Sequence, residues 1–508
     1  MVLKKLSLAV TPTVSSVVFS ALSEYTTTTF GQSHDVNTFI GENDTFSPIG
    51  CIADLLGDLF QGSEIFSLDM YYQDQDSYLE FGKGMVEAGW RQSQQDPYEF
   101  VSHNFWHSCR LYQLFKDLMV VDTTLIENLF SKPESYSEKY ELIVGSLREC
   151  SEMPSVLKRF IVGVSLLAHD FGYPDQHSLG LGKSSHAMLG MKCFKTQLRP
   201  KMTLLLERLG FSEFMEISWK AVEQAILYHN ANTVTHFANG DKAMSTQMIR
   251  YGCGGFFTNI GSLHSCMHSV HGGHKMADAD YLGRSVNVCT SVTELALVRG
   301  FVSPTFVRVV DGKEKGDNHF GAPCLPLLTP LDISHNLISL VMFCDDMDSY
   351  SKRLTAFQID LAEAIVSGIK DISPPLDFSR DATVEDLFGG EDKDLEQAFQ
   401  DFQVDLNIQD LVMQHRIADY KEAFKVKDIR YFVGMYQLSK PSFCVEEGVL
   451  TVKFHLSREF LDDCGSIKVK KEGGGSCPVT HFYPNRVRDS VKWLYYKGEH
   501  INVVCEEG

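Results

Sequence analysis

The chain lacks an excess of positive charge and any long unbroken apolar run. Its 508 residues include 46 Lys and Arg against 66 Asp and Glu, a formal net charge of −20. A surface this acidic repels nucleic-acid backbones and anionic membranes, so dedicated nucleic-acid binding is not expected. No run reaches the roughly 18 apolar residues that a membrane-spanning helix needs. We therefore expect a soluble protein without a membrane span.

The chain also lacks a disulfide pattern. Its thirteen cysteines are odd in number, scattered from Cys51 to Cys505, and include no Cys-x-x-Cys pair. Disulfide-stabilised secreted domains are short and carry even sets of cysteines. The polar residues that interrupt Leu6–Leu22 disfavour a secretory signal. A reducing compartment is the simpler interpretation, and we expect a cytoplasmic protein.

The length allows two to four domains, and the pattern of apolar and polar residues changes twice along the chain. Residues 1–95 show no clear period and predict an irregular N-terminal region of unknown role. Residues 96–295 carry long helical patterns and predict an all-α domain. Residues 296–508 mix extended and helical patterns, with a subdomain division near 377–440. The expected fold class is α+β multidomain, with a mixed α/β C-terminal region.

The C-terminal region contains two further patterns. Eleven acidic residues lie between Asp377 and Asp410, and such a run favours a solvated helical face over an acidic docking surface. Val449–Leu456 alternates like a strand, and Val491–Tyr496 is expected to form a hairpin with His500–Val504. We expect this region to set substrate access, homo-oligomerisation or the choice of a protein partner, which the sequence leaves open.

Histidine is concentrated in the expected helical domain. Eleven of the 18 histidines lie within residues 103–274. His103 and His107 are four residues apart, a spacing that places two side chains on one face of a helix. We expect this face to line a site.

A His-Asp pair ends an almost wholly apolar helical pattern. His169 and Asp170 directly follow Phe160–Ala168. Burying an imidazole and a carboxylate is unfavourable unless their desolvation is compensated, and a divalent metal ion provides that compensation. The pair therefore predicts metal ligands.

The order of the downstream residues resembles a known family. His186, His229 and a final acidic site with Asp278 and Asp280 follow the His-Asp pair. The order His, His-Asp, His, His, Asp across residues 96–290 resembles the HD superfamily of metal-dependent phosphohydrolases. Members of that superfamily commonly end in Ala-Asp-x-Leu, which favours Asp280 over Asp278.

A second motif narrows the resemblance. His103-Asn-Phe-Trp-His107 is similar to the His-Asn-x-x-His motif of class I cyclic nucleotide phosphodiesterases. This resemblance implies that His107 binds metal and that His103 is the general acid that protonates the leaving oxygen. The sequence departs from those enzymes at Tyr173, where they carry a histidine, and His186 and His229 point to the larger ligand sets of binuclear HD proteins.

These residues predict a metal centre and its chemistry. Mixed imidazole and carboxylate ligands suit Mn, Fe, Zn or Mg. Two ions bridged by Asp170 would activate a water, hold the phosphate oxygens and stabilise the leaving oxygen, while Lys183 would neutralise phosphate. The candidate ligands are His107, His169, Asp170, His186, His229 and either Asp280 or Asp278.

The expected function is phosphoester hydrolysis, with a small-molecule substrate. A phosphodiesterase acting on a cyclic nucleotide or another nucleotide phosphoester is favoured over a monophosphatase. Two alternatives stay open. A di-iron oxygenase resembling myo-inositol oxygenase would use the same ligand order, whereas a non-catalytic scaffold would bind a partner protein and carry out no reaction. A second histidine cluster comprises His264, His268, His271 and His274. Because its sequence is rich in glycine, we interpret it as part of a mobile loop rather than as another metal site.

Overall fold

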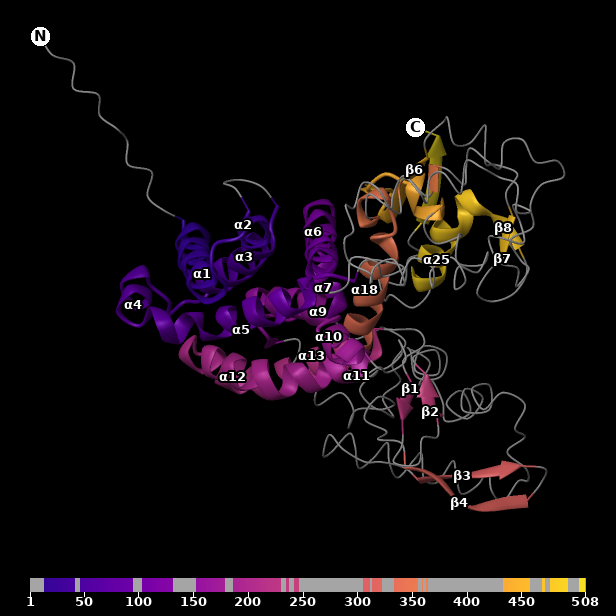
Figure 1. The fold of residues 1–508 in the computed structure, drawn as a ribbon, viewed down its shortest axis with the longest axis horizontal. Helices are drawn as coiled ribbons and strands as arrows, with labels where there is room; N and C mark the ends of the chain where they lie inside the picture. Colours follow the sequence, from indigo (N-terminus) through magenta and orange to yellow (C-terminus); the bar gives the residue numbers. More distant parts are fainter. Residues whose placement is uncertain are drawn as a thin grey trace, which may run out of the picture. The chain divides into compact units, whose positions relative to one another are not determined.

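The computed structural model divides the chain into two compact units. It describes residues 13–41, 46–94, 103–130, 152–178, 186–229, 234–236, 242–245, 305–310, 313–321, 333–354, 359, 362–363, 433–456, 468–470, 476–491 and 502–507. The first unit comprises Met1–Gln95, Asn104–Gln113 and Ile126–Val341. The second comprises Asp96–His103, Leu114–Leu125 and Met342–Gly508. Figure 1 shows the elements in sequence colours.

The N-terminal part of the first unit is helical, so the prediction of an irregular region was wrong. It contains α1 (Val14–Phe30), α2 (His34–Ile40), α3 (Pro48–Gln61), α4 (Leu68–Gln73) and α5 (Gln75–Ser93). Four of these helices begin after a Ser or Thr whose hydroxyl accepts a backbone N–H of the first turn. Glycines hid the helical period of α5, yet they allow close packing: a Cβ at Gly82 would lie 2.7 Å from Leu56 Cδ1.

The helices expected between residues 96 and 230 are present wherever the structure describes them. They are α6 (Phe105–Val121), α7 (Leu125–Leu129), α9 (Ser155–Ala168), α10 (Tyr173–Ser178), α11 (His186–Cys193), the π-helix η3 (Phe194–Leu198), α12 (Arg199–Arg208), the 3₁₀ turn η4 (Ser212–Phe214) and α13 (Met215–Tyr228). Two antiparallel strand pairs follow: β1 (Val234–His236) with β2 (Lys242–Ser245), and β3 (Thr305–Val310) with β4 (Lys313–Gly321). Because β1 and β2 fall within residues 96–295, this region is not all-α.

Helix α9 runs through the core of the first unit. It packs against α3 and α13 (Figure 1), and every residue from Phe160 to Ala168 is buried. Gly163 permits a close approach, since a Cβ there would lie 2.5 Å from Leu55 Cδ1. Each fully buried large apolar side chain contributes about 1.5–3 kcal/mol relative to exposure. The helix therefore holds its C-terminal end, where His169 and Asp170 follow, in a fixed place.

The second unit contains the small mixed sheet of the C-terminal region. Its elements are the end of α18 (Ile333–Met347), η7 (Ser351–Arg353), β5 (Ser442–Glu446), β6 (Val449–Leu456), β7 (Lys468–Lys470), β8 (Ser476–Pro478), η8 (Val479–His481), α25 (Phe482–Val491) and β9 (Asn502–Glu507). The three-stranded sheet has the order β5-β6-β9, and β7 pairs with β8. The described residues thus form a mostly helical chain with a small mixed sheet, which agrees with the α+β class.

The sheet confirms one predicted strand and corrects the predicted hairpin. The strand expected at Val449–Leu456 is β6, with antiparallel β5 on one side and parallel β9 on the other. Val491 ends helix α25, so it starts no hairpin strand. The C-terminal strand instead covers β6, where Val452 lies opposite Val503. The apolar residues of β6 offer β9 a long-range partner that no local turn signal predicts.

Two patterns noted in the sequence fall outside the described residues. They are the acidic run from Asp377 to Asp410 and the glycine-rich stretch with His264 to His274. None of the described helices combines the length and the apolar character that a bilayer-spanning segment requires.

Candidate metal centre

Four histidines and one aspartate of the first unit come together at the ends of four helices. His169 and Asp170 follow α9, His107 lies in the first turn of α6, His186 begins α11 and His229 follows α13. All five side chains are buried, with exposed fractions between 0% and 3%. The structure therefore brings together the five predicted ligands that it describes.

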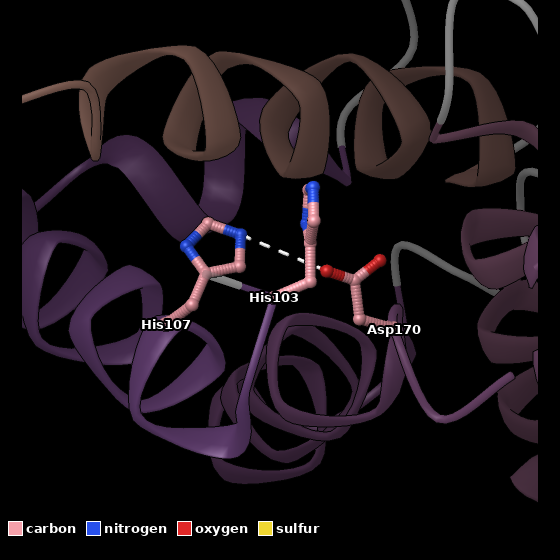
Figure 2. Close-up of side chains that lie close together, drawn as sticks. All are labelled: His103, His107 and Asp170. Atoms are coloured by element: carbon pink, nitrogen blue, oxygen red, sulfur yellow. Dashed lines mark ion pairs between the residues drawn. The ribbon is translucent and has the colours of Figure 1, made fainter. Parts of the chain in front are cut away.

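The start of α6 sets the direction of His107. The Asn104 side-chain Oδ1 accepts a hydrogen bond from the His107 backbone N–H at 3.3 Å, which is the contact of a helix N-cap. Figure 2 shows the resulting approach of the ring to Asp170, with Nε2 3.8 Å from Oδ2. Because α6 begins at Phe105, His103 precedes the helix, and the expectation that one helix carries both histidines was wrong.

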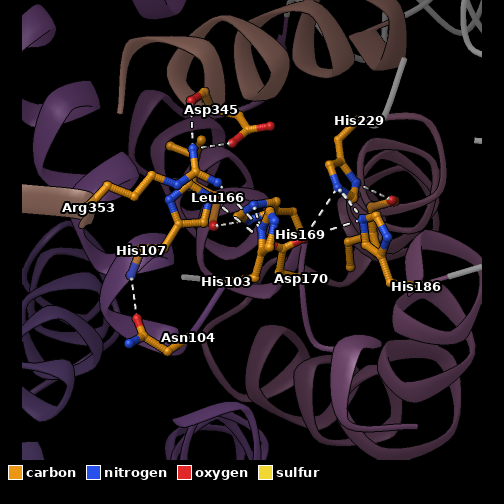
Figure 3. A network of polar contacts seen from close by, with 11 residues as sticks. His103, Asn104, His107, Leu166, His169, Asp170, His186, His229, Asp345 and Arg353 are labelled. Atoms are coloured by element: carbon orange, nitrogen blue, oxygen red, sulfur yellow. Dashed lines mark hydrogen bonds and ion pairs between the residues drawn. The ribbon is translucent and has the colours of Figure 1, made fainter. Parts of the chain in front are cut away.

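The Asp170 carboxylate lies between two pairs of imidazoles (Figure 3). Its Oδ2 is 3.2 Å from His169 Nε2 and 3.8 Å from His107 Nε2. Its Oδ1 is 3.4 Å from His229 Nε2 and 3.5 Å from His186 Nε2. Each carboxylate oxygen therefore faces two ring nitrogens, and one side chain connects both pairs.

Backbone carbonyls fix the tautomer of two rings. His169 Nδ1 is 2.8 Å from the Leu166 carbonyl oxygen, and His229 Nδ1 is 2.7 Å from the Ile226 carbonyl oxygen. A carbonyl only accepts, so Nδ1 donates its proton in both contacts and Nε2 of the neutral ring keeps its lone pair. Histidines that bind metal through Nε2 are oriented by a backbone carbonyl in the same way.

These contacts place electron pairs opposite one another. The lone pair of His169 Nε2 faces Asp170 Oδ2 at 3.2 Å, and the lone pair of His229 Nε2 faces Asp170 Oδ1 at 3.4 Å. Two acceptors at such distances repel unless a proton or a metal ion lies between them. His169, Asp170 and His229 each offer a ligand atom, and these atoms lie within 4.8 Å of one another. The buried cluster can therefore hold a metal ion.

Two buried cysteines lie on the helices that carry His107 and His186. Burial raises the pKa of the Cys109 thiol, on the helix of His107, well above its usual range, and neighbouring Cys51 raises it further. Burial raises the pKa of Cys193, on the helix of His186, to about 11. The groups of ligand atoms that the described residues bring close together consist of imidazole nitrogens and carboxylate oxygens.

Gly172 brings the turn after Asp170 against α11. A Cβ at this position would lie 1.8 Å from the His186 carbonyl oxygen and 2.3 Å from the Gly190 nitrogen. Backbone atoms cannot rotate away as a flexible side chain can. Only glycine therefore allows the turn that carries Asp170 to approach the helix that carries His186.

We expect Gly172→Ala to lower the free energy of unfolding by about 1–3 kcal/mol, the usual effect of overpacking, and also to weaken metal binding. Urea unfolding in chelator and a metal titration measure the two effects. Gly163→Ala is the matched control, because its clash is with side-chain atoms in the core, of which Leu55 Cδ1 at 2.5 Å is the nearest, and not with backbone. Equal loss of metal affinity in both variants would show that general instability, rather than the Asp170 turn, is responsible.

His103 belongs to the second unit. Arg353 Nη2 lies 3.4 Å from His103 Nδ1, and Arg353 Nη1 lies 3.4 Å from Asp345 Oδ1. A guanidinium only donates, so His103 Nδ1 accepts and the proton of the neutral ring sits on Nε2. His103 therefore presents a donor nitrogen at Nε2.

The remaining predicted site residues lie outside the described residues. They are Lys183, Asp278 and Asp280, together with His264, His268, His271 and His274. Their proposed roles stay predictions.

Two side chains at these contacts were missed from the sequence. Tyr173 stacks on His186, and its only sequence signal was a departure from the phosphodiesterase motif. Arg353 lies 250 positions from His103, a separation at which a single sequence carries no contact signal.

Comparison with known proteins adds no identification. No family model matches the chain, and no match was found among curated proteins or solved structures.

Proposed function

We propose that the chain is a metal-dependent phosphohydrolase with an HD-type helical domain, acting on a cyclic nucleotide or another nucleotide phosphoester. The observation that carries the proposal is the Asp170 carboxylate between two imidazole pairs. A carboxylate with two ring nitrogens at each oxygen suits a bridge between two cations. A single structural ion would need only one such oxygen.

The five described ligands divide between two metal positions in this proposal. His107, His169 and Asp170 would hold one ion, and His186, His229 and Asp170 would hold the other. The final acidic ligand is Asp280, with Asp278 as the alternative. When bound, two such ions supply a more acidic water and positive charge for the phosphate oxygens.

The donor set favours a transition metal. Four imidazoles suit Mn, Fe or Zn, whereas Mg prefers oxygen ligands and retains several waters. Within the predicted set of Mn, Fe, Zn and Mg, we therefore place Mg last.

The protein groups have separate tasks in the proposed reaction. Asp170 and the imidazoles would hold the ions, and burial of these side chains excludes bulk water from the ligands. His103 donates the proton of Nε2 to the leaving oxygen. Lys183 neutralises charge on the phosphate.

Metal analysis and a substrate panel test the proposal on the full-length chain. Protein prepared without chelator should carry about two transition-metal ions per chain and hydrolyse a phosphodiester. Chelation should remove activity, and added Mn or Zn should restore it. The panel should include cyclic nucleotides, linear diesters and nucleotide monophosphates.

Three results would contradict the proposal, each in a different way. One ion or none, with His229→Ala changing nothing, would remove the binuclear centre. Oxygen consumption by the iron-loaded protein without phosphoester hydrolysis would favour the di-iron oxygenase. Bound metal with no turnover of any substrate would favour a scaffold that binds a partner protein.

A further inference from the structure

An aromatic side chain covers one face of the His186 imidazole. The rings of Tyr173 and His186 are nearly parallel, with centroids 4.2 Å apart and an interplanar angle of 14°. Both residues are buried, with exposed fractions of 4% and 1%. Two rings packed in this way limit rotation of the imidazole about its own side-chain bonds.

The backbone links this aromatic face to Asp170. The Tyr173 backbone N–H donates to the Asp170 carbonyl oxygen at 3.1 Å, closing the turn that leads into α10. The same short turn therefore carries both the Asp170 carboxylate and the ring that lies on His186. Gly172, between them, allows this turn to reach α11.

The four imidazoles are thus oriented by different devices. Carbonyls of the preceding helical turn hold Nδ1 of His169 and His229. His186 is the first residue of α11, and the face of Tyr173 defines the plane of its ring. In that plane, His186 Nε2 points to Asp170 Oδ1 at 3.5 Å and to His229 Nε2 at 3.2 Å (Figure 3).

We propose that Tyr173 is a positioning residue for the second metal position, where it holds His186 in its ligating orientation. The inference rests on the binuclear centre of the proposed function. It assigns no chemistry to the Tyr173 hydroxyl, because the contact is made by the ring face. A phenylalanine at position 173 should therefore keep His186 in the same orientation, whereas a leucine should not.

Cobalt titration of the full-length metal-free chain tests this inference. Wild-type protein should bind two Co²⁺ ions. Tyr173→Leu should bind the first with unchanged affinity and the second about 10- to 100-fold more weakly, the usual effect of removing a group that orients a metal ligand. The visible absorption of the second Co²⁺ should shift, because His186 no longer has a fixed orientation. Tyr173→Phe should bind the second Co²⁺ with the affinity and the visible absorption of wild type.

Phe160→Leu provides the matched control. Phe160 is a buried aromatic residue of α9, where it packs against Phe81. This variant should lose stability but keep both Co²⁺ affinities. If Tyr173→Leu and Phe160→Leu weaken both ions equally, Tyr173 is an ordinary core residue and the inference is wrong.

The remaining outcomes separate this inference from the proposed function. A wild-type chain with two ions and a Tyr173→Leu variant with the same two affinities would overturn the inference alone. A wild-type chain that binds fewer than two ions would overturn the binuclear centre, and with it the position that Tyr173 is proposed to support.

Discussion

Asp170→Asn is expected to remove metal binding and to lower turnover by about 10³-fold or more. The amide has nearly the same shape, but it cannot offer two anionic oxygens to two cations. Metal ions contribute several kcal/mol of transition-state stabilisation, and each 1.36 kcal/mol corresponds to a tenfold change in rate. His169→Ala should behave in the same way, because the residue follows α9 and faces the same carboxylate oxygen.

Stability measurements separate a lost ligand from a damaged fold. A metal ion that binds only the folded chain adds about 2.7 kcal/mol at a concentration 100 times its Kd, and the Asp170→Asn variant should lose this increment. In chelator the same variant should be as stable as wild type or more stable, because a buried charge has been removed. Melting with and without metal, together with metal content, measures both effects.

Asp175→Asn is the control for this change. Asp175 is five residues away on α10, where its carboxylate pairs with Arg91 at the surface at 2.5 Å. This variant should keep metal and activity. An Asp170→Asn protein with full metal content and an unchanged melting temperature would show that Asp170 is not a ligand.

His103→Ala is expected to lower turnover by about 10²- to 10⁴-fold while leaving metal content unchanged. A positioned general acid contributes on this scale. The donation from Arg353 to Nδ1 leaves the His103 proton on Nε2, the state that an acid requires. The loss should shrink for nitrophenyl esters, because a nitrophenolate leaves without protonation.

His34→Ala is a matched histidine control, since His34 is exposed at the start of α2. Its activity should equal that of wild type. Loss of metal from His103→Ala would make His103 a ligand. An equal loss of activity for good and poor leaving groups would make it an orienting residue, and the proposed mechanism would have no acid.

The sequence was most informative where structure is local. The apolar pattern that ends in His169 and Asp170 predicted α9, and alternation predicted β6 with its observed bounds. Even the tautomer of His169 follows from local geometry, because the accepting carbonyl of Leu166 lies three residues earlier. Helical and strand periods and last-turn contacts depend on near neighbours along the chain, and near neighbours can be read from one sequence.

The errors occurred where local signals were weak or the partner was distant. Glycines that allow close packing masked the period of α5, so a helical region looked irregular. The C-terminal strand was given a hairpin partner in its neighbourhood, whereas β9 pairs with β6 across α25. Strand pairing depends on which apolar surface remains to be covered, and that surface exists only after the other elements have packed.

The sequence by itself determined the donor types at this centre, their order along the chain and the helices that carry them. Only the tertiary structure decided that Asp170 Oδ2 faces His107 and His169 while Oδ1 faces His186 and His229. It also decided that Tyr173 lies on the ring of His186. The physical reason is that distances between helix ends are set by side-chain packing in the core and by close approaches such as that of Gly172 to α11. Spacing along one helix constrains side chains on that helix, but it does not fix how several helices converge on one carboxylate.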